Sequence, residues 1–328
     1  MEKNTPLIEV RNLQKYFATP RGMLHAVDNV SFAIDKGQTL GVVGESGCGK
    51  STLGRTIIHL HESTGGQIFF AGEDITHVSA ARVRQLREEM QIIFQDPYSS
   101  LDPRCTVEQT IQEPLRLCRK YNADEIRLRT QELMELVGID RRMMHAYPHE
   151  LDGGRRQRVG IARALAVDPK FIVCDEPVSA LDVSIQAQVL NLLSDLQEQY
   201  GLTYMFVTHD MSVVRHISDH ICVMYLGQAV EKSASRELFQ KPLHPYTKAL
   251  LSVIPSTDID RPRNRDLVLQ GELVSPIDPK PGCRFAARCP YAGAGCEQPQ
   301  QLEEVLPGHF VSCCRIRAIN RDLLGEAT

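Results

Sequence analysis

The chain has 328 residues, of which 42% are hydrophobic and 24% charged, and its formal net charge is −4. This composition excludes a disordered or fibrous chain, and the weak acidity argues against a nucleic-acid binder, which needs a basic face. No apolar run is long enough to cross a bilayer, and the opening residues lack a signal-peptide core. We therefore expect a chain that stays in the cytoplasm, with a peripheral role at a membrane still open.

The first third of the chain alternates short strands with helices. Alternating apolar and β-branched residues predict strands within 7–35, and the apolar run 39–43 leads into a glycine-rich loop. Helical spacing follows the loop at 51–60. Further strands are predicted at 67–75 (with a turn at Gly72) and 91–94, and a helix at 80–90.

The rest of the chain continues this alternation before its composition changes. Residues 105–165 read as almost wholly helical, and 171–177 as a buried strand that ends in two acids. Helices at 184–201 and 211–219 alternate with strands at 203–210 and 221–227, a pattern that predicts a right-handed parallel α/β sheet. After about residue 252 the polar, proline-bearing stretch 254–266 reads as a linker.

The glycine-rich loop matches the phosphate-binding pattern G-x-x-x-x-G-K-[ST] in full. Its glycines let backbone N–H groups turn inward on phosphates, and the following helix adds the positive end of its dipole. Lys50 is expected to contact the β- and γ-phosphates of ATP, and the Ser51 hydroxyl to bind Mg²⁺. The predicted nucleotide-binding residues of this segment are Gly44, Glu45, Ser46, Gly47, Cys48, Gly49, Lys50, Ser51 and Thr52.

Two acids end the buried strand that starts at Phe171. Asp175 stands where a carboxylate would hold Mg²⁺, and Glu176 is the candidate base for the attacking water. An acidic pair at a strand end is a weak signal alone. Together with the phosphate-binding loop it predicts nucleotide hydrolysis, because ligands of α/β proteins bind at the carboxyl edge of the sheet.

The motifs together resemble those of the ATP-binding subunits of ABC transporters, in the dipeptide/oligopeptide permease family. Beside the loop and FIVCDEP (171–177), the chain carries IIFQDPYSSLDPR (92–104), LDGGRRQR (151–158), SALD (179–182), VTHD (207–210) and HPYTKALL (244–251). The last motif and the tail GELVSPIDPKPGC are similar to what peptide-type subunits carry. The resemblance covers nearly the whole chain.

The resemblance implies roles for the matching positions. Gln95 would sense Mg²⁺ and the attacking water, so that Ser51, Gln95 and Asp175 form the Mg²⁺ set. His209 would contact the γ-phosphate, and Asp182 would act across a dimer interface. Phe17 or its neighbour Tyr16 would stack on adenine, and the sequence does not separate the two.

The resemblance also implies an architecture and an assembly. Residues 1–252 would form a P-loop ABC ATPase cassette, with a RecA-like α/β core, an antiparallel β subdomain and a helical subdomain at about 97–165. Residues 253–328 would form a Cys-rich C-terminal extension. Two cassettes would sandwich ATP head to tail, as a heterodimer at the cytoplasmic face of the inner membrane. The assembly would drive two transmembrane permease subunits and import short peptides from an extracellular binding protein.

One loop departs from the family pattern LSGGQ, because Asp152 stands before Gly153 and Gly154 where the family has serine. An ionised aspartate cannot donate a hydrogen bond to a phosphate, and two like charges 4 Å apart repel by roughly 4 kcal/mol before screening. In one reading Asp152 caps the helix and Arg155 offsets its charge. In the other, the composite site built with this loop binds ATP and hydrolyses it poorly.

Five of the ten cysteines crowd into the tail: Cys283, Cys289, Cys296, Cys313 and Cys314. Thiolates so gathered suit a [4Fe–4S] cluster, with Cys283, Cys289, Cys296 and Cys313 as the candidate ligands, or a structural Zn²⁺. The short C-x₂₋₄-C pairs of zinc modules are missing, and some peptide-type subunits carry an iron–sulfur cluster in this region, so iron is favoured over zinc. Reduced, unliganded thiols are the third alternative.

Other functions stay open on the sequence alone. Similar subunits serve nickel importers, and Asp152 also permits a mainly regulatory nucleotide-binding half of a heterodimer. A mechanical ATPase of translation or DNA repair is a further alternative. Such proteins usually carry tandem cassettes or long coiled-coil insertions, and this chain has neither.

Overall fold

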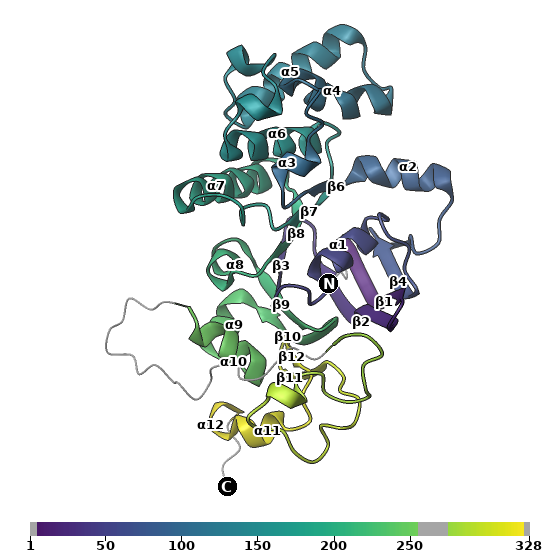
Figure 1. The fold of residues 1–328 in the computed structure, drawn as a ribbon, viewed down its shortest axis with the longest axis vertical. Helices are drawn as coiled ribbons and strands as arrows, with labels where there is room; N and C mark the ends of the chain where they lie inside the picture. The colour runs from purple at the N-terminus through teal and green to yellow at the C-terminus, as the bar shows by residue number, and fades with distance from the viewer. Residues whose placement is uncertain (1–4, 255–274, 325–328) are drawn as a thin grey trace. The chain divides into compact units, whose positions relative to one another are not determined.

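The structure is a computed structural model that describes residues 5–254 and 275–324, and the chain forms two compact units. Unit 1 comprises Met1–Leu7, Asp35–Gln38 and His77–Val207. Unit 2 comprises Ile8–Ile34, Thr39–Thr76 and Thr208–Thr328. Figure 1 shows the elements of both units. None of the helices in the described residues has both the length and the hydrophobicity of a membrane-spanning segment.

Unit 1 is built on three parallel strands, which confirms the strands predicted around residues 91–94, 171–177 and 203–210. β7 (Phe171–Asp175) pairs with β6 (Met90–Ile93) on one side and with β8 (Thr203–Thr208) on the other. Every residue of β7 is buried, as expected of a central strand covered on both faces. The helices are α2 (Ala80–Glu89), α3 (Pro97–Ser100), α4 (Val107–Cys118), α5 (Ala123–Leu136), α6 (Gly153–Leu165) and α7 (Val183–Tyr200).

Most helices of unit 1, α2 to α6, begin at residues whose side chains accept hydrogen bonds from free backbone N–H groups. Thr106 and Asn122 form capping boxes with Gln109 and Glu125 at the starts of α4 and α5. α4, α5 and α6 pack on one another through buried residues such as Ile111 (Figure 1). Two short 3₁₀ turns, at Arg141–Met143 and Pro148–Glu150, connect α5 to α6. The predicted helical stretch 105–165 is therefore helical with short interruptions.

Unit 2 contains an antiparallel sheet and a second group of strands. The antiparallel sheet has the order β2-β1-β4-β5, from β1 (Ile8–Thr19), β2 (Gly22–Ile34), β4 (Gly65–Phe70) and β5 (Glu73–Asp74). In the second group, β3 (Thr39–Val43) pairs in parallel with β9 (His220–Tyr225). The helices of this unit up to residue 252 are α1 (Lys50–Ile57), α8 (Met211–Ile217), α9 (Ser235–Gln240) and α10 (Pro245–Ser252).

The parallel pairing predicted for the strands up to residue 227 is found between β3 and β9, and the strands that follow β9 add antiparallel pairs. β9 turns back into β10 (Gln228–Ala234) through the two residues Leu226 and Gly227, and the two strands pair antiparallel. Both turn residues have positive φ, 43° and 84°, which suits the right-handed twist of a tight hairpin. β10 then pairs with β12 (His309–Val311), and β12 with β11 (Glu303–Leu306). None of the strands β10, β11 and β12 was predicted from the sequence.

The residues 275–324, called the C-terminal segment below, are built into unit 2. Besides β11 and β12 they include a 3₁₀ turn at Ala286–Arg288 and the helices α11 (Ile316–Ile319) and α12 (Arg321–Leu324). The segment begins along the edge of β2, where Leu24 and Ile277 form an antiparallel bridge. The predicted linker 254–266 lies outside the described residues except for Ile254.

A buried carboxylate joins β10, α10 and β12. Glu231 is fully buried and accepts hydrogen bonds from the backbone N–H groups of Leu243 and His244 and from His309 Nε2. His244 caps the start of α10, and its Nδ1 accepts a hydrogen bond from the Tyr246 N–H at 3.1 Å. This bond requires an unprotonated Nδ1. Burial also favours the neutral ring and lowers the pKa of His244 to about 4, although the nearby Glu231 opposes the shift.

The state of His244 predicts a loss of stability in mild acid. Between pH 6.5 and 4 the unfolded chain binds a proton at this residue and the folded chain does not, so stability falls as pH falls. From pH 7 to pH 5 we expect His244 to cost about 2 kcal/mol of unfolding free energy. Urea unfolding of the wild type and of His244→Asn at both pH values measures the difference. The matched control His77→Asn alters an exposed histidine and should keep the wild-type pH dependence. If His244→Asn lost as much unfolding free energy between pH 7 and pH 5 as the wild type does, the assignment of this loss to His244 would be wrong.

Candidate nucleotide site

The phosphate-binding loop lies where the sequence predicts it, between β3 and α1 of unit 2. Its glycines adopt backbone conformations that other residues avoid, with φ at 157° for Gly44 and 101° for Gly49. A Cβ at Gly49 would stand 1.9 Å from the carbonyl oxygen of Ala26, and one at Gly44 would stand 2.2 Å from that of Met224. The loop therefore packs too closely on its neighbours for any side chain at these two positions.

Lys50 is the first residue of α1, and its side chain is almost wholly buried. Its Nζ donates to the carbonyl oxygens of Gly44 and Glu45, at 2.8 Å and 3.0 Å. These bonds hold the ammonium inside the loop, as phosphate binding requires. Cys48 is also buried, and burial raises the pKa of its thiol, so it acts as a packing residue of the loop. Ser51 and Thr52 continue the first turn of α1.

Glu45 is held in place at its backbone and at its carboxylate. Its N–H donates to the hydroxyl of Tyr246 at 2.9 Å, and its carboxylate takes two bonds from Arg288, at 2.7 Å and 3.1 Å. Sequence reasoning assigned no role to either partner. Tyr246 stands in the motif HPYTKALL, but nothing near Arg288 in the sequence indicates this contact, because 243 residues separate it from Glu45.

The two candidates for adenine stacking have different surroundings in unit 2. Tyr16 stacks on His25, with ring centroids 4.0 Å apart, and its hydroxyl donates a hydrogen bond to the Asp28 carboxylate at 2.5 Å. Burial and the bond to Asp28 both raise the pKa of Tyr16. Phe17 meets the ring of His61 edge-on, with centroids 5.6 Å apart.

Unit 1 brings together two residues that the sequence predicted to be catalytic. Gln95 Nε2 donates to Glu176 Oε2 at 3.0 Å, across 81 residues of sequence. Asp175 ends β7 and is fully buried. Glu176 has a φ of 48°, an unusual value for this residue type, and its N–H is bound to Val207 O at 2.9 Å. Strained backbone of this kind is concentrated at functional sites.

In the loop that departs from the family pattern LSGGQ, Asp152 caps the following helix, as one of the two interpretations of this residue predicts. Asp152 precedes α6, and its carboxylate accepts the N–H of Arg155 at 2.7 Å. The Arg155 guanidinium lies 3.4 Å from the second carboxylate oxygen. Gly153 and Gly154 form the first turn of α6 behind the cap. The cap and the charge partner are thus both present at Asp152.

The remaining predicted residues stand at loop positions. His209 follows β8 and is exposed, and Asp182 precedes α7 and is exposed as well. Tyr16, Phe17, His209 and the phosphate-binding loop belong to unit 2, whereas Gln95, Asp152, Asp175, Glu176 and Asp182 belong to unit 1.

Comparisons with known proteins identify the family. Residues 27–179 match the ABC transporter family, and residues 230–296 match the C-terminal region of oligopeptide/dipeptide transporters. The chain is 50% identical to the oligopeptide transport ATP-binding protein AppF of Bacillus subtilis, over 94% of this chain and 96% of that protein. It is 49% identical to OppF of Salmonella typhimurium, over 94% and 93%. The chain belongs to the ATP-binding subunits of ABC transporters, in the oligopeptide group.

Solved structures agree with this assignment. The ATP-binding cassette MJ0796, in a dimeric post-hydrolysis state bound to ADP and phosphate, is 28% identical with a TM-score of 0.65, and the match covers 70% of this chain and 99% of that one. CbiO1 of Clostridium perfringens, part of the transporter complex cbiONQ, is 29% identical with the same TM-score, over 72% and 92%. The predicted ABC ATPase cassette fold is thus confirmed.

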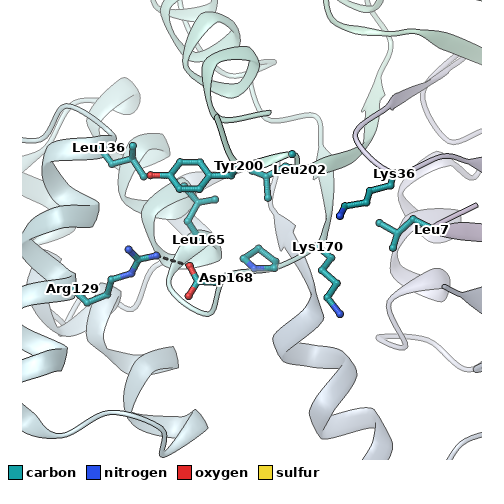
Figure 2. Close-up of a pocket in the computed structure, with 11 residues that line it drawn as sticks. Leu7, Lys36, Arg129, Leu136, Leu165, Asp168, Lys170, Tyr200 and Leu202 are labelled. Carbon is teal, nitrogen blue, oxygen red and sulfur yellow. Dashed lines mark hydrogen bonds and ion pairs between the residues drawn. The ribbon is translucent and has the colours of Figure 1, made fainter. Parts of the chain in front are cut away.

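A cavity of about 420 Å³ in unit 1 contains none of the predicted site residues of this ABC subunit. Leu136, Leu165 and Leu202 line it, together with Tyr200, and Arg129 pairs with Asp168 at its border (Figure 2). It lies beside Lys170 and Leu202, which precede β7 and β8, whereas Asp175 ends β7 and Glu176 follows it. Ligands of such sheets bind at the carboxyl ends of the strands, so this cavity is not the nucleotide site.

The tail cysteines lie close enough to affect one another electrostatically. Burial raises the pKa of Cys283 to about 11 and that of Cys313 to about 12, and the neighbouring thiols add to both shifts. Cys314 forms a side-chain hydrogen bond with Cys296. Within residues 5–254 and 275–324, however, no three cysteine, histidine or acidic side chains are arranged to hold one metal ion. The thiols as placed do not fit the predicted cluster.

The cap at Asp152 predicts how two substitutions differ in this ABC subunit. Asp152→Ala removes the cap and should lower the free energy of unfolding by about 1 kcal/mol. Asp152→Ser keeps a capping oxygen and restores the family residue. Because Arg155 already offsets the aspartate charge, ATP turnover of the assembled transporter should change by less than about threefold in Asp152→Ser. A much larger rise in turnover would favour the reading in which Asp152 repels phosphate.

Proposed function

We propose that this chain binds and hydrolyses ATP to power the import of short peptides through an ABC transporter. The observation that carries the proposal is the buried Lys50 inside a complete phosphate-binding loop, in a chain half identical to oligopeptide transport ATP-binding proteins over nearly its whole length. The match of residues 230–296 to the C-terminal region of oligopeptide/dipeptide transporters supports the peptide cargo over nickel.

The roles of the site residues follow from their chemistry. Gly44–Thr52 hold the phosphates, and Mg²⁺, which prefers oxygen ligands, is assigned to Ser51, Gln95 and Asp175. Gln95 donates its Nε2 to Glu176, and its carbonyl oxygen is therefore the atom available to a metal or a water. Mg²⁺ would neutralise charge on the phosphates when bound. Glu176 polarises the attacking water, with His209 as the partner of the γ-phosphate.

The assembly is a second part of the proposal. Two related ATPase subunits pair head to tail as a heterodimer, with Asp152–Gly154 and Asp182 facing the partner's nucleotide. A partner with an unaltered loop leaves one fully competent site. Dimeric forms of the similar cassette MJ0796 support pairing. The permease-facing stretch follows Gln95, where Tyr98 is 63% exposed and stacks on Arg156. The chain would then be peripheral, at the cytoplasmic face of the inner membrane.

The division of the chain also belongs to this proposal. Residues 1–252 act as the cassette, with the helical subdomain at about 97–165, and 253–328 as the Cys-rich extension. A mainly regulatory nucleotide-binding half remains the second candidate, because Asp152 replaces the family serine.

Removal of the general base tests the catalytic role. We expect Glu176→Gln to lower peptide-stimulated ATP turnover by about 10²–10⁴-fold in the assembled transporter, with ATP affinity retained. Turnover is measured with partner ATPase, permease subunits and binding protein, with and without peptide. Glu198→Gln, an exposed acid on α7, is the matched control.

The outcomes separate the candidates. Turnover that ignores peptide contradicts the cargo. Turnover that survives Glu176→Gln unchanged assigns the chemistry to the partner and makes this chain the regulatory half.

The cysteines form the last part of the proposal. We assign a [4Fe–4S] cluster to Cys283, Cys289, Cys296 and Cys313, which requires the thiols to move from the positions described above. Protein purified without oxygen should then contain iron and acid-labile sulfide and absorb broadly in the visible, and Cys289→Ser should lose both. Cys105→Ser is the control outside the set. Zinc without iron, or metal-free protein with alkylatable tail thiols, would contradict the cluster.

A further inference from the structure

The start of the phosphate-binding loop is anchored by residues from the last third of the chain. Glu45 takes a bidentate ion pair from Arg288, while Tyr246 binds its N–H and Lys50 its carbonyl oxygen. A bidentate arginine–carboxylate pair fixes orientation as well as distance, which a single lysine contact does not. The conformation of the loop at Glu45 thus depends on the C-terminal segment.

The Arg288 side chain is buried, and Glu45 is its main hydrogen-bond partner. Its side chain is 6% exposed, against 25% for Glu45. The hydrogen bonds to Glu45 are the main cause that raises the pKa of Arg288, and Tyr225 Oη accepts a longer bond at 3.4 Å. Because the guanidinium is buried, it interacts with Glu45 of the loop and is largely shielded from solvent.

A second arginine of the C-terminal segment, Arg284, contacts residues at the far end of the phosphate-binding loop. Arg284 donates to the carbonyl oxygen of Leu226 and to the carboxylate of Asp28. The other oxygen of Asp28 accepts the Tyr16 hydroxyl. Next to Leu226, Gly227 donates its N–H to Cys48 O at 2.8 Å and accepts the N–H of Asp28. Arg284 therefore holds the turn that contacts the far end of the loop, and the carboxylate that binds Tyr16.

We propose that Arg284 and Arg288 are positioning residues for ATP, which gives the C-terminal segment a direct part in nucleotide binding. Arg288 holds the loop at Glu45, and Arg284 holds it through Gly227 and fixes Tyr16 through Asp28. A loop held in shape before ATP arrives loses less freedom on binding, and this raises affinity. The inference rests on ATP binding by the loop and goes beyond the proposed transport function.

Arg288 offers the cleaner test, because the carboxylate left behind is partly exposed and can be hydrated. We expect Arg288→Ala to weaken Mg-ATP binding to the full chain by about tenfold, measured by titration calorimetry. Arg288→Lys restores charge without the bidentate geometry and should be intermediate. In the Glu45→Gln background, Arg288→Ala should cost less than about twofold, because the ion pair is already gone.

Two further measurements separate positioning from general damage to the fold. Arg321→Ala removes an exposed arginine of the same segment and should leave ATP affinity unchanged. In the assembled transporter, Arg288→Ala should raise the KM for ATP while kcat at saturating ATP stays within about twofold.

The proposal is overturned if Arg288→Ala binds Mg-ATP as the wild type does. It is also overturned if the variant loses the same factor with and without Glu45, because the effect would then not pass through this pair. If the wild-type chain itself fails to bind Mg-ATP, the proposed function fails, and the inference with it. That result is distinct from a loss confined to the variants.

Discussion

A lysine ammonium held almost wholly out of water is the constraint on which the nucleotide site depends. An unpaired buried charge would be very costly, and Lys50 is tolerated because two carbonyl oxygens of its own loop accept hydrogen bonds from its ammonium. The loop that presents these carbonyls includes Gly44 and Gly49, whose backbone conformations other residues avoid. The loop in turn packs directly on neighbouring backbone at Ala26 and Met224. Phosphate binding is thus built from backbone geometry, and side chains outside the loop preserve it.

The C-terminal segment belongs to this support. It pairs with β10, bridges to β2 and sends two arginines to the residues that surround the loop. The buried Glu231 ties β10, α10 and β12 into the same body, so that Tyr246 and Arg288 approach Glu45 from elements fixed to one another. A segment that sequence alone describes as a cysteine-rich appendage is structurally part of the nucleotide-binding unit.

Unit 1 positions the two carboxylates, Asp175 and Glu176, that are predicted to take part in ATP hydrolysis. β7 is buried along its whole length. Asp175 is its last residue, and Glu176 follows directly. The positive φ of Glu176 is maintained by the bond from its N–H to Val207, and its side chain is oriented by Gln95. Asp152 keeps the start of α6 capped, so the altered loop retains its helix.

The sequence by itself determined the family, the phosphate-binding loop, the strand that carries Asp175 and most of the helices. These features are local: a glycine pattern, a capping residue or an apolar run specifies conformation within a few residues. The hairpin into β10, the strands β11 and β12, and the contacts of Arg284 and Arg288 were decided only by the tertiary structure. Arg288 and Glu45 are 243 residues apart, and neither carries a local pattern that names its partner. Their pairing depends on which surfaces the folded chain brings together.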